Sequence, residues 1–251
     1  MSGRTVTAGV LLIGDELLSG RTQDANLQAI ATFLGALGVQ VREARAVPDI
    51  QEEIVAALNA LRGRYDYVLT TGGIGPTHDD ITADSVAAAF GVPIAERADA
   101  LAVMESHYGR ALDRPEDDNR RRMARIPDGA SLIVNASTGA PGFQIGNVFV
   151  MAGVPNIMRA MLEDLPERIE GGAVIRSLTV GAAGLRESDL ADGMVRVQDE
   201  CGVQIGSYPY FTEKSRGVNI VARSTDEAAL ARAGDALEDL VRAAGGTPER
   251  S

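Results

Sequence analysis

Residues 70–80 read TTGGIGPTHDD, and they close a strand that the apolar pattern predicts at 65–71. Glycines at 72, 73 and 75 can adopt positive φ angles and let a ligand approach the backbone closely. A helix is predicted at 82–90, so its first amides and its dipole favour an anion at this loop. The stretch therefore predicts a phosphate-binding loop at the end of a strand.

Two aspartates at 79 and 80 finish this loop, although carboxylates would repel a phosphate. A divalent cation removes the conflict, because hard carboxylate oxygens bind Mg²⁺ or Mn²⁺ and the ion bridges to phosphate oxygens. The alternative is a simple glycine-rich turn in which Asp80 and Thr82 cap the following helix. The residue pattern alone leaves both readings open.

Composition narrows the class of protein. The chain has 251 residues, of which 45% are apolar and 24% charged, as in ordinary globular proteins. Its net charge of −11 argues against generic nucleic-acid binding, which needs a basic surface. The apolar runs are too short to cross a bilayer, and the N-terminus lacks the layout of a signal peptide, so we expect a cytoplasmic protein. The single cysteine, Cys201, allows neither an intrachain disulfide nor a cysteine zinc site.

Helical and strand-like segments alternate over the first two thirds of the chain, which predicts an α/β fold with a mostly parallel sheet. The expected strands are 6–13, 39–47, 65–71, 131–135 and 147–152, and the expected helices are 25–37, 50–61, 82–90, 98–109, 116–124 and 156–165. The arginine run at 120–122, with Arg125, is expected to form a solvated helix face. His107 is expected to be structural.

Pro166 and the EGG segment at 170–172 predict a domain boundary, with a large domain at 1–170 and a small one at 171–251. The small domain is expected to be α+β with an antiparallel sheet. Its predicted strands are 174–180, 203–208 and 217–223, and its predicted helices are 187–200 and 226–244. The segment TEKSRG (212–217), which contains Lys214, predicts a surface turn between the last two strands.

Ligands of open α/β sheets bind where loops leave the carboxyl ends of strands. Three loops fit that position, GDELLSG (14–20), the loop at 71–80, and NASTGAPGF (135–143), and we expect them to meet in one cleft. The expected ligand-binding residues are Gly14, Asn26, Thr71, Gly72, Gly73, Ile74, Gly75, Pro76, Thr77, Ser137, Thr138, Gly139 and Gly142. Valine in place of Gly73 is expected to impair ligand binding more than folding.

The stretch TGGIGPTHDDIT (71–82) resembles the signature loop of the molybdopterin-binding-domain superfamily. Its form is similar to the branch that contains the N-terminal domain of competence/damage-inducible protein A and the corresponding domain of eukaryotic FAD synthases. Further motifs of that branch resemble GDELLSGRTQDAN (14–26), GAPGF (139–143) and GVPNIMRAM (153–161), and residues 185–209 resemble its appended domain. The resemblance covers about residues 6–246. It implies a three-layer α/β domain, a small α+β domain, and a homodimer or homotrimer.

The resemblance implies that Asp80 is essential and that Asp49, in a VPD element, is a second essential aspartate. Glu16 lies in the first loop, where a carboxylate could act as a general base or metal ligand. We expect Asp80, Asp49 and Glu16 to be catalytic and Asp80 and Asp79 to hold the metal. The alternatives are a helix cap for Asp49 and a first-turn acid for Glu16. His78 and Asp79 replace residues that in molybdopterin adenylyltransferases include an arginine, which argues against adenylyl transfer to molybdopterin.

Domains of this branch are associated with divalent-metal-dependent cleavage of ADP-ribose and with FAD hydrolysis. We therefore expect a nucleotide pyrophosphatase, a hydrolase that uses Mg²⁺, Mn²⁺ or Co²⁺. Two alternatives stay open: a molybdopterin-binding or adenylyltransferase protein of molybdenum-cofactor biosynthesis with a pterin ligand, and a non-catalytic nucleotide-binding module. The full competence-related protein adds a domain that deamidates nicotinamide mononucleotide. The chain ends at Ser251 without room for that domain, so we expect no deamidation.

Overall fold

The computed structural model describes residues 4–212 and 215–251, which form two compact units, Met1–Ala173 and Val174–Ser251. Each unit has its own hydrophobic core. The predicted surface turn at 212–217 is only partly described, because Glu213 and Lys214 lie outside the described residues.

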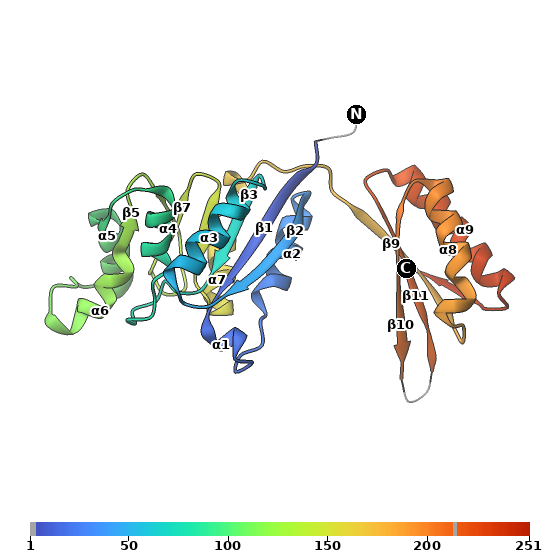
Figure 1. The fold of residues 1–251 in the computed structure, drawn as a ribbon, viewed down its shortest axis with the longest axis horizontal. Coiled ribbons are helices and arrows are strands. Elements are labelled where there is room, and N and C mark those ends of the chain that lie inside the picture. The colour runs from blue at the N-terminus through green and yellow to red at the C-terminus, as the bar shows by residue number, and fades with distance from the viewer. Residues whose placement is uncertain (1–3, 213–214) are drawn as a thin grey trace. The chain divides into compact units, whose positions relative to one another are not determined.

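The first unit contains a six-stranded sheet in the order β2-β1-β3-β8-β7-β6 (Figure 1). The bounds are β1 Val6–Ile13, β2 Val39–Val47, β3 Tyr67–Thr71, β6 Ser131–Ile133, β7 Gly142–Ile145 and β8 Val148–Met151. β1 pairs with β2 and β3 in parallel, β3 pairs with β8 in parallel, and only β7 runs against its neighbours. This confirms the predicted α/β fold with a mostly parallel sheet.

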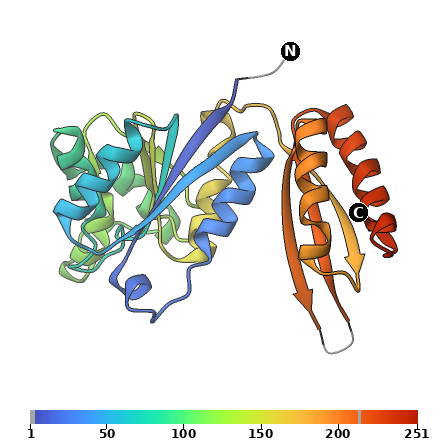
Figure 2. The same ribbon diagram turned by 45° about the vertical axis from the view of Figure 1, so that its right-hand side comes forward.

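Helices cover both faces of this sheet and make a three-layer domain (Figures 1 and 2). They are α1 Asp15–Leu18, α2 Asn26–Ala36, α3 Gln51–Arg62, α4 Thr82–Phe90, α5 Ala98–Tyr108, α6 Asp118–Arg121 and α7 Pro155–Leu162. Leu11 and Ile13 of β1 pack in the core with α3, α4 and α5, while Val10 and Leu12 pack in the core with α2 and α7. A strand that is buried on both faces reads as a continuous apolar run, which explains the sequence of β1.

Several segments of the first unit differ from their predicted structure. In the predicted loop at 14–20, Asp15–Leu18 forms the short helix α1. The helix expected at 116–124 is broken into 3-10 turns at Pro115–Asp117 and Arg122–Ala124 around the single turn of α6. β7 lies inside the segment expected to be a loop, and β4 (Ile94–Glu96) pairs antiparallel with β5 (Arg125–Pro127) in a separate two-stranded sheet. These pieces have three or four residues each, too short for a periodic signal.

The second unit is an antiparallel sheet in the order β10-β11-β9-β12. Its elements are β9 Arg176–Ala183, α8 Glu187–Cys201, β10 Gln204–Phe211, β11 Arg216–Ser224, α9 Glu227–Ala243 and β12 Pro248–Arg250. Alternate residues of β11, Val218, Ile220 and Ala222, are buried against the core that α8 and α9 complete. The α+β prediction is confirmed, and β12 is an additional strand.

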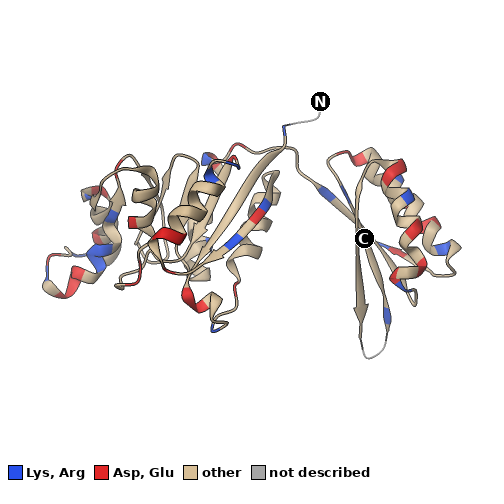
Figure 3. Ribbon diagram, viewed as in Figure 1, with Lys and Arg blue, Asp and Glu red and all other residues tan. Residues whose placement is uncertain are grey.

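In the six-stranded sheet, the edge strand β2 carries charged residues, whereas β1 and β3 carry none (Figure 3). Charges on an edge strand discourage pairing with another chain. Across the described residues, no helix combines the length and the apolar character needed to traverse a membrane.

Candidate functional site

Four loops, together with Asp49 in the loop after β2, line one open cleft of about 610 Å³. They follow β1, β3, β6 and β8, which run in the same direction, so their carboxyl ends meet at one edge of the sheet. The first three are the loops that the sequence predicted to converge, and the fourth, at 152–155, follows β8. The sheet topology therefore assembles the cleft from segments that are far apart in the chain.

Gly72 and Gly73 give the loop after β3 its shape, with φ angles of 104° and 66°. The N–H of Gly72 donates to the Met151 carbonyl oxygen at 3.2 Å, and the Gly73 carbonyl oxygen accepts from the N–H of Thr82 at 2.9 Å. A Cβ atom on Gly72 would collide with the carbonyl oxygen of Ile13. The loop is therefore clamped between β1, β8 and the start of α4.

The structure corrects two expectations about these glycines. Gly75 does not adopt a positive φ; a Cβ atom there would instead lie 2.7 Å from Oδ2 of Asp80. A Cβ atom on Gly73 would collide with Oγ1 of Thr82, the first residue of α4. Valine at position 73 would therefore disturb the fold, and not mainly the ligand space.

Asp80 closes the loop on itself. Its Oδ2 accepts a hydrogen bond from the N–H of Thr77 at 2.8 Å and another from the Thr77 hydroxyl. Neither Asp80 nor Thr82 caps α4, because Ile81 occupies the N-cap position and makes no side-chain cap bond. The helix-cap reading is therefore wrong for both residues. Asp79 points into solvent beside His78 and lines the cleft together with Asp80.

Glu16 and Asp49 line the same cleft and follow β1 and β2. Asp49 does not cap α3; its Oδ2 accepts the N–H of Asp15 at 2.9 Å. The Glu16 carboxylate lies over Gly14: a Cβ atom on Gly14 would be 2.5 Å from Oε2 of Glu16. Burial, and then the negative charges of Asp15, Glu16 and Asp79, raise the pKa of Asp49 above its ordinary value.

This raised pKa predicts that Asp49→Asn stabilises the metal-free protein at pH 7, by up to about 1 kcal/mol after solvent screening. Asparagine keeps the acceptor for the Asp15 N–H and removes a charge that the folded state disfavours. The gain grows as the pH rises from the unfolded-state pKa through the higher folded-state pKa, and it vanishes below both. Urea unfolding in EDTA at pH 7 and at pH 3 measures it.

Asp66→Asn is the control of opposite sign. The N–H and hydroxyl of Thr7, each 2.8 Å from Oδ2, lower the pKa of Asp66. Its charged form therefore stabilises the folded state at pH 7, and that contribution is lost as the pH falls through the lowered folded-state pKa. If the two substitutions changed the free energy of unfolding equally at pH 7, the electrostatic account of Asp49 would be contradicted.

The described lining of the cleft has no lysine, arginine or histidine. It has four carboxylates, those of Glu16, Asp49, Asp79 and Asp80. The rest of the lining is glycine, small polar groups, and an apolar wall that includes Tyr108, Met123 and Pro141. A polyanionic ligand at this site consequently requires backbone N–H groups and a bound cation.

Most of the predicted ligand-binding residues line the cleft: Gly14, Gly72, Gly73, Ile74, Gly75, Pro76 and Thr138. The others do not, namely Asn26, Thr71, Thr77, Ser137, Gly139 and Gly142. Asn26 is buried and donates from Nδ2 to the Gly153 carbonyl oxygen at 2.7 Å, so it holds the fourth loop. Gly139 packs against His107, and Gly142 belongs to β7.

Asn135 is a site residue that the sequence analysis missed. It is buried, and its Nδ2 donates to the Thr138 hydroxyl at 2.6 Å and to the Ala140 carbonyl oxygen at 2.9 Å. Its Oδ1 accepts the N–H of Ser137 at 3.0 Å. Asparagine followed by small polar residues is typical of such a turn, so its position could have been found.

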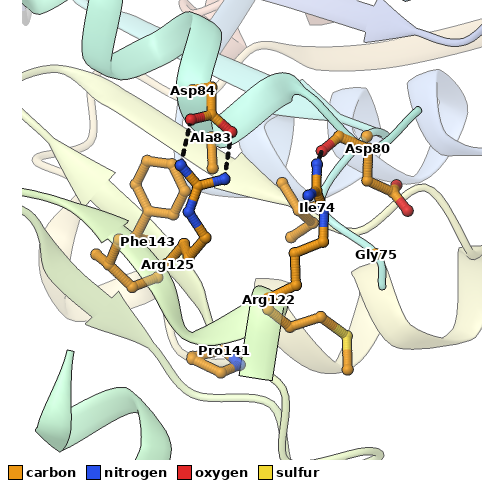
Figure 4. Close-up of a pocket in the computed structure, with 12 residues that line it drawn as sticks. Ile74, Gly75, Asp80, Ala83, Asp84, Arg122, Arg125, Pro141 and Phe143 are labelled. Atoms are coloured by element: carbon orange, nitrogen blue, oxygen red, sulfur yellow. Dashed lines mark hydrogen bonds and ion pairs between the residues drawn. The ribbon is translucent and has the colours of Figure 1, made fainter. Parts of the chain in front are cut away.

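The arginine run forms a solvated helix face only in part, because Arg120 is exposed on α6, whereas Arg122 and Arg125 are half-buried and lie outside that helix. Arg125 forms a bidentate pair with Asp84 at 2.6 and 2.8 Å, and Arg122 reaches the Asp80 carbonyl oxygen at 3.4 Å (Figure 4). Arg120 and Arg121 pair with acidic partners at 117 and 96. In Figure 4 the Asp80 carboxylate points away from Arg122 and toward Gly75, so the arginine supports the loop main chain.

Residues 9–170 match the family model described as "Probable molybdopterin binding domain", which covers more than half of the chain. The chain belongs to this molybdopterin-binding-domain family. Residues 180–246 match the model of the FAD synthase middle domain, which agrees with the resemblance of the second unit.

Several relatives of this molybdopterin-binding-domain protein are named CinA-like protein. The CinA-like protein of Gemmatimonas aurantiaca is 36% identical over 194 residues, which cover 73% of this chain and 45% of the relative. A protein of Aeropyrum pernix is 36% identical over 252 residues, which cover 94% of this chain and 92% of that protein. The chain spans about half the length of the CinA-like relatives.

Among solved structures, CinA of Thermoplasma acidophilum, described as a protein of unknown function, superposes with a TM-score of 0.60 and 35% identity. The superposition covers 65% of this chain and 98% of that structure. The CinA-like relatives and the CinA structure confirm the branch that the sequence motifs indicated.

Proposed function

We propose that this molybdopterin-binding-domain protein is a divalent-metal-dependent pyrophosphatase that cleaves ADP-ribose or a related dinucleotide such as FAD. One observation carries the proposal. The N–H groups of Gly73, Ile74 and Gly75 donate to no acceptor among the described residues, and they belong to a loop that lines the cleft. Successive unpaired N–H groups in a glycine-rich loop are a typical phosphate cradle.

The carboxylates of the cleft suit a hard, strongly hydrated cation. The described part of the chain holds no group of three histidine, cysteine or acidic side chains able to bind an ion by itself. Mg²⁺ needs no such group, because it commonly takes one or two carboxylates, water and substrate phosphate oxygens. Asp79 and the free Oδ1 of Asp80 would hold it. The ion would neutralise the phosphate charge beside the four carboxylates of the cleft.

Hydrolysis needs a base for the attacking water, and Asp49 and Glu16 line the same cleft as the proposed cradle. The water oxygen forms a bond to one phosphorus atom, the bridging P–O bond breaks, and the water proton passes to a carboxylate. ADP-ribose would yield AMP and ribose 5-phosphate. The raised pKa of Asp49 suits this role, because a base is most effective when its pKa approaches the working pH.

A substrate panel tests the proposal. ADP-ribose, FAD and NADH are incubated with the protein and Mg²⁺, Mn²⁺ or Co²⁺, and released AMP is measured by chromatography. We expect AMP from at least one dinucleotide. Nucleotide binding by calorimetry without AMP would favour a non-catalytic binding module instead.

The family description favours a second candidate, a pterin-binding step of molybdenum-cofactor assembly. The apolar wall of the cleft could hold a fused pterin ring system. Tight binding of molybdopterin without dinucleotide turnover would support this candidate over the pyrophosphatase.

A further inference from the structure

The two ends of the cleft differ in chemistry. The carboxylates of Glu16 and Asp49 follow β1 and β2, at one side of the sheet. The loop at 135–141 follows β6, at the other side, and there the lining includes Tyr108, Met123 and Pro141. Neighbouring strands lie about 4.8 Å apart, so β1 and β6, four spacings apart in this sheet, are about 19 Å apart. The cleft is thus long, with an acidic and an apolar end.

Tyr108 is the aromatic side chain among the described residues of that lining. It is the last residue of α5, and 38% of it is exposed. Its ring contacts the His107 ring edge-to-face at 5.6 Å between centroids, and the Arg120 guanidinium lies 5.5 Å from its centroid. Arg120 is in turn fixed by the buried carboxylate of Asp117 at 3.0 Å.

These contacts hold the ring in place before any ligand arrives. His107 also packs on Gly139, so the end of α5 is tied to the loop at 135–141. A preorganised aromatic ring loses little conformational freedom when a planar group stacks on it. His107, which was expected to be structural, and Tyr108 therefore form a platform at the apolar end.

We propose that Tyr108 is a specificity-determining residue that stacks on the base of a nucleotide whose phosphates lie on the 73–75 loop. This inference rests on the proposed function, because it places the dinucleotide along the cleft. A ring stacked on a base contributes about 1–3 kcal/mol, which corresponds to about 5- to 150-fold in affinity. The stacking acts equally on the ground state and the transition state, so it lowers KM and leaves kcat nearly unchanged.

The test compares ADP-ribose with its abasic analogue, in which hydrogen replaces adenine. Tyr108→Ala should raise KM for ADP-ribose at least ~5-fold and leave KM for the abasic analogue unchanged. Tyr108→Phe should restore the wild-type KM, because the ring is kept. Val103→Ala is the control for α5 itself, since Val103 is exposed on the same helix and does not line the cleft; we expect no change.

Calorimetric binding of both compounds in the presence of Mg²⁺ separates this inference from the hydrolase proposal. If wild-type protein binds ADP-ribose without cleaving it, a selective loss of adenine-dependent affinity in Tyr108→Ala still supports the stacking role. Equal losses for ADP-ribose and the abasic analogue, or no loss for either, would overturn it.

Discussion

Replacement of Asp80 by asparagine is expected to lower turnover of the preferred dinucleotide by about 100-fold, or about 2.7 kcal/mol of activation free energy. Asparagine has nearly the shape of aspartate, and its carbonyl oxygen can still accept the N–H of Thr77. The loop therefore keeps its form. What is lost is a negative charge next to the proposed metal, and Mg²⁺ held by few carboxylates depends on that charge.

Initial rates of AMP release with saturating Mg²⁺, together with calorimetric affinities, measure this effect. Nucleotide affinity in metal-free buffer should stay the same or rise, because repulsion between Asp80 and the phosphates is removed. Asp79→Asn should be milder, since Asp79 points into solvent and does not close the loop.

Thr77→Val distinguishes charge from loop closure. It removes the hydroxyl that donates to Asp80 and leaves the carboxylate in place. We expect a fall of less than ~10-fold. A loss as large as that of Asp80→Asn would show that Asp80 matters for the shape of the loop, and wild-type rates in Asp80→Asn would mean that any metal is held elsewhere.

The largest expected effect on stability belongs to Gly72→Ala, which should lower the free energy of unfolding by at least ~3 kcal/mol. Gly72 has a φ of 104°, which alanine strongly disfavours, and its Cβ atom would collide with the Ile13 carbonyl oxygen at the end of β1. Because the obstacle is backbone, relief requires separation of β1 from the loop. Urea unfolding of the purified variant measures the loss.

Gly91→Ala separates the two causes. Gly91 ends α4 with a φ of 66°, and a Cβ atom there meets nothing within 4 Å among the described residues. Its substitution should cost only about 1 kcal/mol, from the backbone conformation alone. If both alanine variants lowered the free energy of unfolding equally, the close approach of Gly72 to β1 would not contribute to the loss.

The sequence was most informative where one strand and its loop are contiguous. The apolar run of β1 and the glycine-rich loop after β3 predict where the carboxyl ends of these strands lie, because each pattern is contained in a short stretch of sequence. β7 was missed, since its four residues begin with Gly142, are followed by Gly146, and pair with β8 only in the folded chain. Such short antiparallel strands have no periodicity of their own.

Site residues could be predicted when they sit on the loops, and not when the fold brings them from elsewhere. Asp49 and Asp80 belong to local motifs, whereas Tyr108 reaches the cleft from the end of α5. Asn26 follows a motif too, yet its side chain is used to hold the Gly153 carbonyl oxygen. Nothing in its spacing distinguishes a ligand contact from a contact with another loop.

The most direct test of the pyrophosphatase account is a time course with ADP-ribose and EDTA-treated protein, to which Mg²⁺, Mn²⁺ or Co²⁺ is then added. The account predicts no product before the addition, and afterwards AMP and ribose 5-phosphate in equal amounts with at least one of the ions. Formation of AMP at the same rate in EDTA, or its absence with all three ions, would contradict it.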